Sequence, residues 1–230
     1  MKTRTCFVGG LTALLLTLLG AQPVWASGET IFSDDFDDGN ADGWVVLAGT
    51  WSVQDGYYEQ TSSTLGGMSE TEEWIDADLT TGVAFSVNTR IVEGLGCYGR
   101  EVDWRIDGGT RIWMEYIGHQ RELRCRCNIN GSVIFNDHIV PSYEEWTGTD
   151  GMWHELSFTL LGNRLEFQRD GEHLFTFQDD VLYDMPYSCK VLLHTWGSHT
   201  AFDDVTVSTV LDPTRANSST WGAIKRMFRD

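Results

Sequence analysis

Basic residues, prolines and long apolar runs are all scarce in this 230-residue chain. It has 4 prolines, and 16 Lys and Arg against 34 Asp and Glu give a formal net charge of −18. Nucleic-acid binding requires clustered Lys and Arg side chains that displace counterions from phosphates, so we expect no nucleic-acid partner. A hydrophobic content of 41% argues against disorder and predicts one substantial domain with a buried core.

Only one apolar run is long enough to suggest a targeting segment. It extends from Cys6 to Leu19, follows two bases, and precedes Val24-Trp25-Ala26, whose small residues occupy the −3 and −1 positions of a signal-peptidase site. We therefore predict a signal peptide over residues 1–26 and a secreted or cell-surface product. An uncleaved anchor is the alternative, although the run is shorter than the ~20 residues that span a bilayer. No later segment is apolar enough to span a membrane.

Cysteine is sparse, and removal of the signal peptide would leave four. Cys125 and Cys127 are two residues apart in a strand-like run, where they point the same way but lie too far apart to bond to each other. An even number in an exported chain suggests disulfides, so we expect each to pair with Cys97 or Cys189. Buried thiols are the alternative.

Long stretches at helical spacing are missing between residues 31 and 210, where apolar and polar residues alternate with period two. Gly162-Asn163 and Asp170-Gly171 are typical of two-residue hairpin turns, since both residue types tolerate positive φ. The chain is predicted to be all-β, with about a dozen strands in two packed antiparallel sheets. The clearest strand predictions are 57–61, 83–92, 101–106, 111–116, 155–160, 164–168, 173–177, 190–196 and 201–210.

Three blocks of sequence resemble a known superfamily. They are IFSDDFDDGNADGWVVLAGTWSVQDGYYEQT, GMWHELSFTLLGNRLEFQRDGEHLFTF and HTWGSHTAFDDVTV. Together they are similar to laminin-G-like domains of the concanavalin A-like lectin/glucanase superfamily, and most similar to bacterial extracellular domains of the 3-keto-disaccharide hydrolase-like group. The resemblance implies a jelly-roll β-sandwich over residues 27–212, a fold that hosts lectins, glycosidases and adhesion modules.

An acidic loop is the best chemical signal in the sequence. Five aspartates fall within nine residues from Asp34 to Asp42, and a hard cation bound through oxygen would relieve their repulsion. Residues 38–43 also match the start of an EF-hand loop, but Gly49 stands where the closing Glu belongs, which excludes a true EF-hand. The resemblance implies that calcium links the first loop to the last strand. The expected ligands of a structural Ca²⁺ are Asp35, Asp37, Asp38, Asn40, Asp42, Asp203 and Asp204; a solvated acidic turn is the alternative.

Arginines cluster between residues 100 and 126, on segments that alternate charged and apolar side chains. Neighbouring strands would then carry opposite charges on one polar face, either as a cross-strand ion-pair ladder or as a ligand groove. In a groove, Arg would hold hydroxyls or carboxylates, and Trp113, Tyr116, His194 or Trp196 would stack on a sugar ring. The candidate ligand-binding residues are Glu101, Asp103, Arg105, Trp113, Arg124, Arg126, His194 and Trp196.

Catalysis has weaker support in the sequence. Retaining glucanases of the superfamily carry an E-x-D-x-x-E strand; Glu101 and Asp103 begin that pattern, but Ile106 replaces the closing Glu. The candidate catalytic carboxylates are Glu101, Asp103 and Glu115.

The last segment changes character. Residues 213–230 contain a linker followed by a short basic amphipathic stretch, which is predicted to dock on a partner or surface, or to be a frayed terminus. We expect a secreted, calcium-stabilised carbohydrate-binding or adhesion module without catalysis. A saccharide hydrolase and a structural cell-surface protein are the alternatives.

Overall fold

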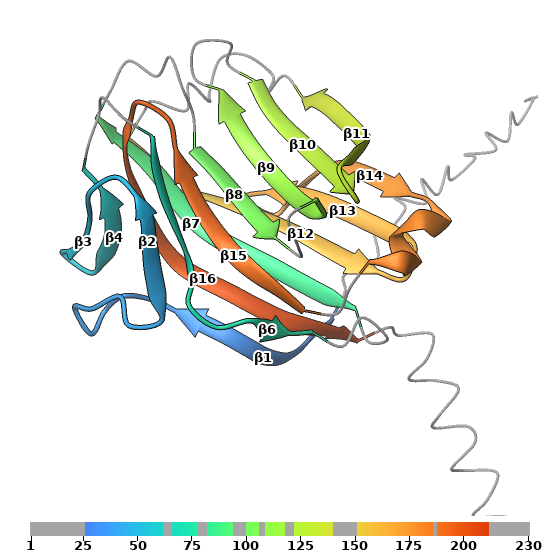
Figure 1. The fold of residues 1–230 in the computed structure, drawn as a ribbon, viewed down its shortest axis with the longest axis horizontal. Coiled ribbons are helices and arrows are strands. Elements are labelled where there is room, and N and C mark those ends of the chain that lie inside the picture. The colour runs from blue at the N-terminus through green and yellow to red at the C-terminus, as the bar shows by residue number, and fades with distance from the viewer. Residues whose placement is uncertain are drawn as a thin grey trace, which may run out of the picture.

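The computed structural model describes residues 26–61, 66–77, 82–93, 100–105, 109–117, 122–139, 151–185 and 188–211. These residues form two eight-stranded antiparallel sheets that lie face to face (Figure 1). The predicted all-β jelly-roll sandwich is confirmed. The predicted signal peptide, except for Ala26, and the basic tail lie outside the described residues, and so does Cys97.

Sheet A contains β1 and seven strands in a continuous order. The order is β14 (Glu172–Gln178), β13 (Arg164–Arg169), β12 (His154–Leu161), β7 (Val83–Glu93), β16 (His199–Leu211), β4 (Tyr57–Gln60) and β3 (Trp51–Gln54), with β1 (Ala26–Asp34) paired to β16.

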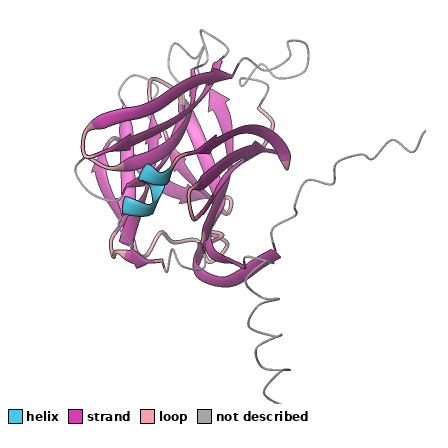
Figure 2. Cartoon of the chain, turned by 90° about the vertical axis from the view of Figure 1, so that its right-hand side faces the viewer, coloured by secondary structure: helices cyan, strands magenta, loops and turns pink. Residues whose placement is uncertain are grey.

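Sheet B likewise contains seven strands in a continuous order and one further strand. Its order is β11 (Ser132–Ile139), β10 (Glu122–Ile129), β9 (Arg111–Ile117), β8 (Arg100–Arg105), β15 (Ser188–Thr195), β5 (Gly67–Thr71) and β2 (Trp44–Ala48), with β6 (Ile75–Asp76) paired to β15. Strands dominate the described chain, and its one helix is the short 3₁₀ turn η1 (Asp180–Asp184) (Figure 2). No helix within these residues is long and apolar enough to cross a membrane.

The two predicted hairpin turns are present. Leu161 pairs with Arg164 and Arg169 pairs with Glu172, so each loop has two residues. Asp170 and Gly171 have φ values of 51° and 73°, the positive pair that a type I′ turn requires. The local turn chemistry therefore sets the register where these hairpins begin; farther along β13 the pairing with β14 shifts between Phe167 and Gln168.

The core lies between the inner faces of the sheets. Sheet A contributes phenylalanines and branched aliphatics from alternating positions, and sheet B contributes the corresponding positions of β9, β10 and β15. The largest fully buried side chains are Tyr116, Phe36, Phe85, Phe158, Phe167, Phe202, Ile112, Met114, Leu123, Leu156 and Leu165. Because alternate residues of each strand enter this core, the other residues of sheet B face outward.

The disulfide prediction is wrong for the described cysteines. Cys125, Cys127 and Cys189 are buried thiols, and each belongs to the core cluster. Burial raises the pKa of the Cys127 thiol to about 12, so the sulfur stays protonated at neutral pH. Here the cysteines act as small apolar core residues.

Candidate functional site

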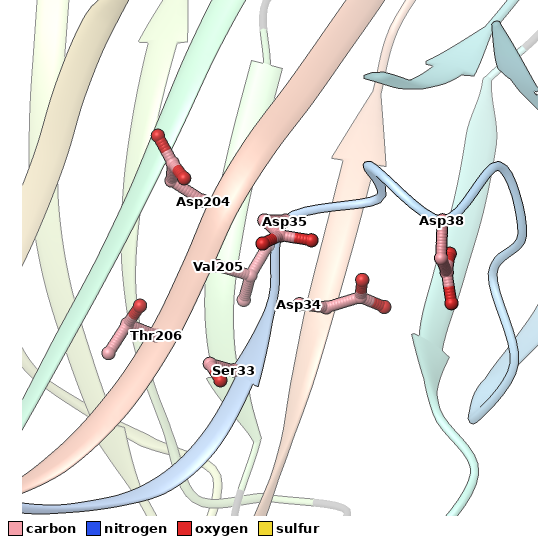
Figure 3. Close-up of a pocket in the computed structure, with 7 residues that line it drawn as sticks. All are labelled: Ser33, Asp34, Asp35, Asp38, Asp204, Val205 and Thr206. Carbon is pink, nitrogen blue, oxygen red and sulfur yellow. The ribbon is translucent and has the colours of Figure 1, made fainter. Parts of the chain in front are cut away.

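An acidic cavity of about 370 Å³ opens where β1 ends beside β16 (Figure 3). Asp34, the last residue of β1, pairs with Val205 of β16, and this register brings the first loop against the last strand. The described residues that line the cavity include four carboxylates and no base. They are Ser33, Asp34, Asp35, Asp38, Asp204, Val205 and Thr206.

A β-bulge in β16 carries two adjacent aspartates, of which Asp204 lines this cavity. The pairing of β16 with β7 shifts register between Asp203 and Thr206, and Asp204 has a φ of 48°. The Asp204 backbone N–H donates to Asp203 Oδ1 at 2.8 Å, and Asn88 Nδ2 donates to Asp204 Oδ2 at 2.8 Å. The bulge places neighbouring acids beside the first loop, a use for which bulges are well suited.

Asp34 anchors the start of the acidic loop. Its Oδ1 accepts from the Phe36 backbone N–H at 3.0 Å, and its Oδ2 accepts from Trp44 Nε1 at 2.8 Å. Phe36, at a φ of 50°, inserts its ring into the core and stacks on Tyr58 with centroids 5.2 Å apart. Both Asp34 oxygens are therefore used to hold the loop on the sandwich.

The segment that matches an EF-hand start folds as consecutive Asx turns. Asp38 Oδ1 accepts from the Asn40 backbone N–H at 3.1 Å, and Asn40 Oδ1 accepts from the Asp42 N–H at 2.8 Å. Asn40 and Asp42 are not among the described residues that line the cavity, whereas Asp35, Asp38 and Asp204 are. Asp37 lies close by, within electrostatic range of Asp203.

The electrostatics of this cavity are unfavourable for ionised carboxyls. Burial raises the pKa of Asp203, and the charges of Asp204, Asp37 and Asp35 raise it further, against the lowering effect of the Asp204 N–H. Burial likewise raises the pKa of Asp34. Carboxylate oxygens suit a hard cation such as Ca²⁺. Within the described residues, however, no three His, Cys, Asp or Glu side chains are grouped so that they could hold a metal ion.

The outward face of sheet B carries the second polar site. Backbone register aligns β15, β8, β9 and β10 in three rows across the strands. The first row contains positions His194, Glu101, Glu115 and Arg124; the second Leu192, Asp103, Trp113 and Arg126; the third Lys190, Arg105, Arg111 and Asn128. Seven of the eight candidate ligand-binding positions thus fall in these rows, which we call the charged face. The eighth, Trp196, follows β15 directly.

Ion pairs lie on the charged face, both along a strand, as within β10, and between strands. Arg124 Nη2 lies 3.0 Å from Glu122 Oε2, and Arg126 Nη1 lies 3.3 Å from Glu115 Oε2. Lys190 Nζ lies 3.1 Å from Glu70 Oε1 on β5, a partner that sequence reasoning missed. Buried and partly exposed positions alternate along the five residues of β5, and Glu70 occupies a partly exposed one. This alternation was the signal for its outward position.

A second cavity, of about 200 Å³, opens on this face over β9, β10 and β11. Trp113 lies at its base with an exposed fraction of 3%, and the Arg111 guanidinium covers the indole ring at 3.9 Å from the centroid. Trp113 therefore cannot stack on a sugar ring as predicted, because an arginine occupies that face. The described lining residues are Arg111, Trp113, Arg126, Asn128, Val133 and Asn136.

One exposed aromatic of the charged face lies next to β15. Trp196 has an exposed fraction of 44%, and its ring is 4.4 Å from that of His194. It is a geometrically suitable platform for stacking. Tyr116 is not, because it is fully buried on the core side of β9, and its predicted stacking role is wrong.

Comparison with known proteins finds similarity in structure only. No family model matches the chain, and no curated protein matches its sequence. The carbohydrate-binding module CBM66 from Bacillus subtilis is similar with a TM-score of 0.56 and 14% identity, covering 73% of this chain and 96% of that one. A Bacillus licheniformis beta-glucanase has a TM-score of 0.57 and 12% identity, covering 81% of this chain and 100% of that one.

A third similar structure is a protein of unknown function with a galectin-like fold from Bacillus subtilis, with a TM-score of 0.63 and 9% identity. It is covered over 99% of its length, and this chain over 81%. These likenesses agree with the concanavalin A-like fold that the sequence resembles. The finer resemblance to the 3-keto-disaccharide hydrolase-like group has no family match behind it.

Proposed function

We propose that this protein is a secreted carbohydrate-binding module whose ligand lies along the charged face of sheet B. The observation that carries the proposal is the three-row register, which gathers charged positions, a cavity and the exposed Trp196 on one outward face. Sugar sites combine planar hydrogen-bonding groups with an aromatic platform, and Arg124 and Trp196 supply one of each. The fold shared with a carbohydrate-binding module and with glucanases supports the same class of ligand.

Binding to a glycan array, quantified by affinity electrophoresis, tests the proposal. Trp196→Ala and Arg124→Ala are each expected to weaken binding at least tenfold, because they remove the platform and a charged hydrogen-bond donor. Tyr183→Ala is the matched control. Tyr183 is also exposed, but it belongs to η1, which follows β14 of sheet A and is not part of the charged face. Absence of binding to every glycan would reject the proposed function.

We also propose a structural Ca²⁺ in the acidic cavity between the first loop and β16. Asp35, Asp38 and Asp204 would hold it, with Asp37 and Asp203 beside them; the side chains would have to close around the ion. The donor chemistry and the like-charge crowding support this assignment. The bound ion would neutralise the cavity and link the two ends of the domain, which stabilises the folded state by mass action.

Saccharide hydrolysis is the second candidate. Register places Glu101 directly opposite Glu115, and retaining glycosidases use carboxyl groups about 5–5.5 Å apart. Reducing-sugar release from a saccharide library measures this activity, and Glu101→Gln combined with Glu115→Gln should abolish it. Turnover that persists in the double variant would exclude these carboxylates as the catalytic pair.

A further inference from the structure

Arg90 has no carboxylate partner among the described residues, although acids outnumber Lys and Arg by 34 to 16 in this chain. It lies on β7 and faces outward from sheet A, because its neighbours Thr89 and Ile91 are buried. The described part of the chain offers its guanidinium no ion pair and no hydrogen bond, and its Nε is buried without an acceptor. The other described arginines of sheet A, Arg164 and Arg169, both pair with carboxylates.

Two aromatic rings hold this guanidinium in place. Its Cζ lies 4.8 Å from the ring centroid of Tyr57 and 4.7 Å from that of Trp153, and the two ring centroids are 4.9 Å apart. The rings come from β4 and from the residue before β12, on opposite sides of the β7–β16 pair. Ala201, directly opposite Arg90 on β16, shares the outward face and is fully buried, and its small side chain leaves the space in which the rings meet.

The carboxylates nearest to Arg90 by register have other partners. Glu59, in the same row on β4, has its Oε2 at 2.9 Å from His199 Nε2. Asp203, in the next outward row, accepts from the Asp204 backbone N–H at 2.8 Å. A guanidinium held by rings on its face keeps its N–H edges for hydrogen bonds, and the strongest acceptor for them is an oxyanion. The described chain supplies none, so the acceptor would come from outside.

We infer that Arg90 anchors a second ligand site, on the outward face of sheet A, which takes a carboxylate or sulfate group of an acidic glycan. Both groups are oxyanions, which the planar fork of an arginine binds through parallel hydrogen bonds. Tyr57 and Trp153 are partly exposed and border the anion, so they would contact the sugar that carries it. That a glycan carries the anion rests on the proposed function. With ligand sites on both outer faces of the sandwich, one domain would link two glycan chains.

The test is isothermal titration with two acidic glycans and their neutral counterparts. A galacturonate trimer is compared with its methyl ester, and a carrageenan tetrasaccharide with its desulfated form. Calcium is present at one fixed concentration, because the acidic cavity adjoins the row of Asp203 and its charge would repel an anion. At least one acidic glycan should bind at least tenfold more tightly than its counterpart. The net charge of −18 opposes general adsorption of anions, so such a preference requires a local site.

Variants locate the preference for the acidic form. Arg90→Gln removes the charge and should reduce the preference at least tenfold. Arg90→Lys keeps a cation over the rings and so protects the fold, but it should also lose the preference, because an ammonium has no planar fork.

Two further variants are controls. Arg169→Gln removes an arginine of sheet A that pairs with Asp170 and Glu172, and Arg124→Ala alters the charged face of sheet B. Both should leave the preference for the acidic form unchanged. Melting curves check that all four variants are folded.

The outcomes separate the inference from the proposed function. A preference for an acidic glycan that both Arg90 variants lose and both controls keep supports the inference. A preference that survives in either folded Arg90 variant would overturn it, and would mean that the rings and Arg90 only brace the sheet. Binding of neutral glycans with no preference for acidic ones would also overturn it and leave the proposed function standing. Absence of binding by every acidic and neutral glycan would overturn both.

Discussion

The acidic cavity and the charged face are both rich in ionisable groups, but they balance charge in opposite ways. At the charged face acids lie beside bases, as in the pairs of Arg126 with Glu115 and Lys190 with Glu70. In the acidic cavity no described lining residue is basic, and the pKa values of Asp34 and Asp203 are raised. The first region therefore pairs acids with bases of the same chain, whereas the second gathers carboxyl groups whose ionised forms are disfavoured.

Replacement of the anchoring carboxylate should have the largest effect. Asp34→Ala would leave Trp44 Nε1 and the Phe36 N–H without their acceptor, and each lost partner costs ~1–3 kcal/mol, so we expect about 3 kcal/mol lower stability. Urea denaturation measures the difference. Asp42→Ala is the control, since Asp42 is exposed in the same loop and should change stability by less than ~0.5 kcal/mol. An equal loss of stability in the two variants would mean that stability depends on the total charge of the cavity alone and not on the hydrogen bonds of Asp34.

Calcium should have the next largest effect, and only through the acidic cavity. A ligand bound only by the folded state at about 100 times its Kd adds ~2.7 kcal/mol. We therefore expect the melting midpoint to fall on addition of EDTA and to recover with excess Ca²⁺. Asp204→Asn should reduce this response, whereas Glu115→Gln on the charged face should not. An unshifted melting midpoint after EDTA would exclude a structural Ca²⁺ in the acidic cavity.

The fold could be predicted further than the sites, for a physical reason. Period-two alternation and the Asp170-Gly171 turn are local properties, so the strands and the β12–β14 register could be anticipated. The disulfide prediction failed because counting cysteines cannot distinguish an oxidised pair from thiols such as Cys127 and Cys189, which fill the core.

Site details depended on relations between distant strands. The sequence left open which aromatics face outward; the register places Trp113 there, and the packing of Arg111 over its ring excludes a sugar from that surface. The proximity of Asp204 to Asp35 depends on a bulge and on a pairing that spans most of the chain. Neither feature has a local sequence signal.

The ion-pair ladder should contribute less than either change in the acidic cavity. Glu115→Gln breaks the 3.3 Å pair with Arg126, and a cross-strand pair of this kind is worth ~0.2–1 kcal/mol. A double-mutant cycle with Arg126→Gln isolates the coupling from other contacts of either residue. A coupling energy above ~2 kcal/mol would show that this part of the charged face is a stabilising network more than a surface available to ligands.

The smallest effect concerns the pH response of the acidic cavity and has opposite signs without and with calcium. The raised pKa of Asp203 means that its charged form is disfavoured by folding, so between the ordinary value of 3.8 and the raised value the native state binds more protons than the unfolded chain. Stability contributed by this group is therefore present at acid pH and is lost as the pH rises through that window. Asp203→Asn should remove this loss and raise stability at pH 7 by about 0.5 kcal/mol, measured by melting without calcium. Because the same group favours Ca²⁺ when ionised, the variant should be the less stable of the two once calcium is added. If Asp203→Asn is more stable both without and with calcium, then Asp203 contributes like-charge repulsion to the cavity but has no role in binding a cation.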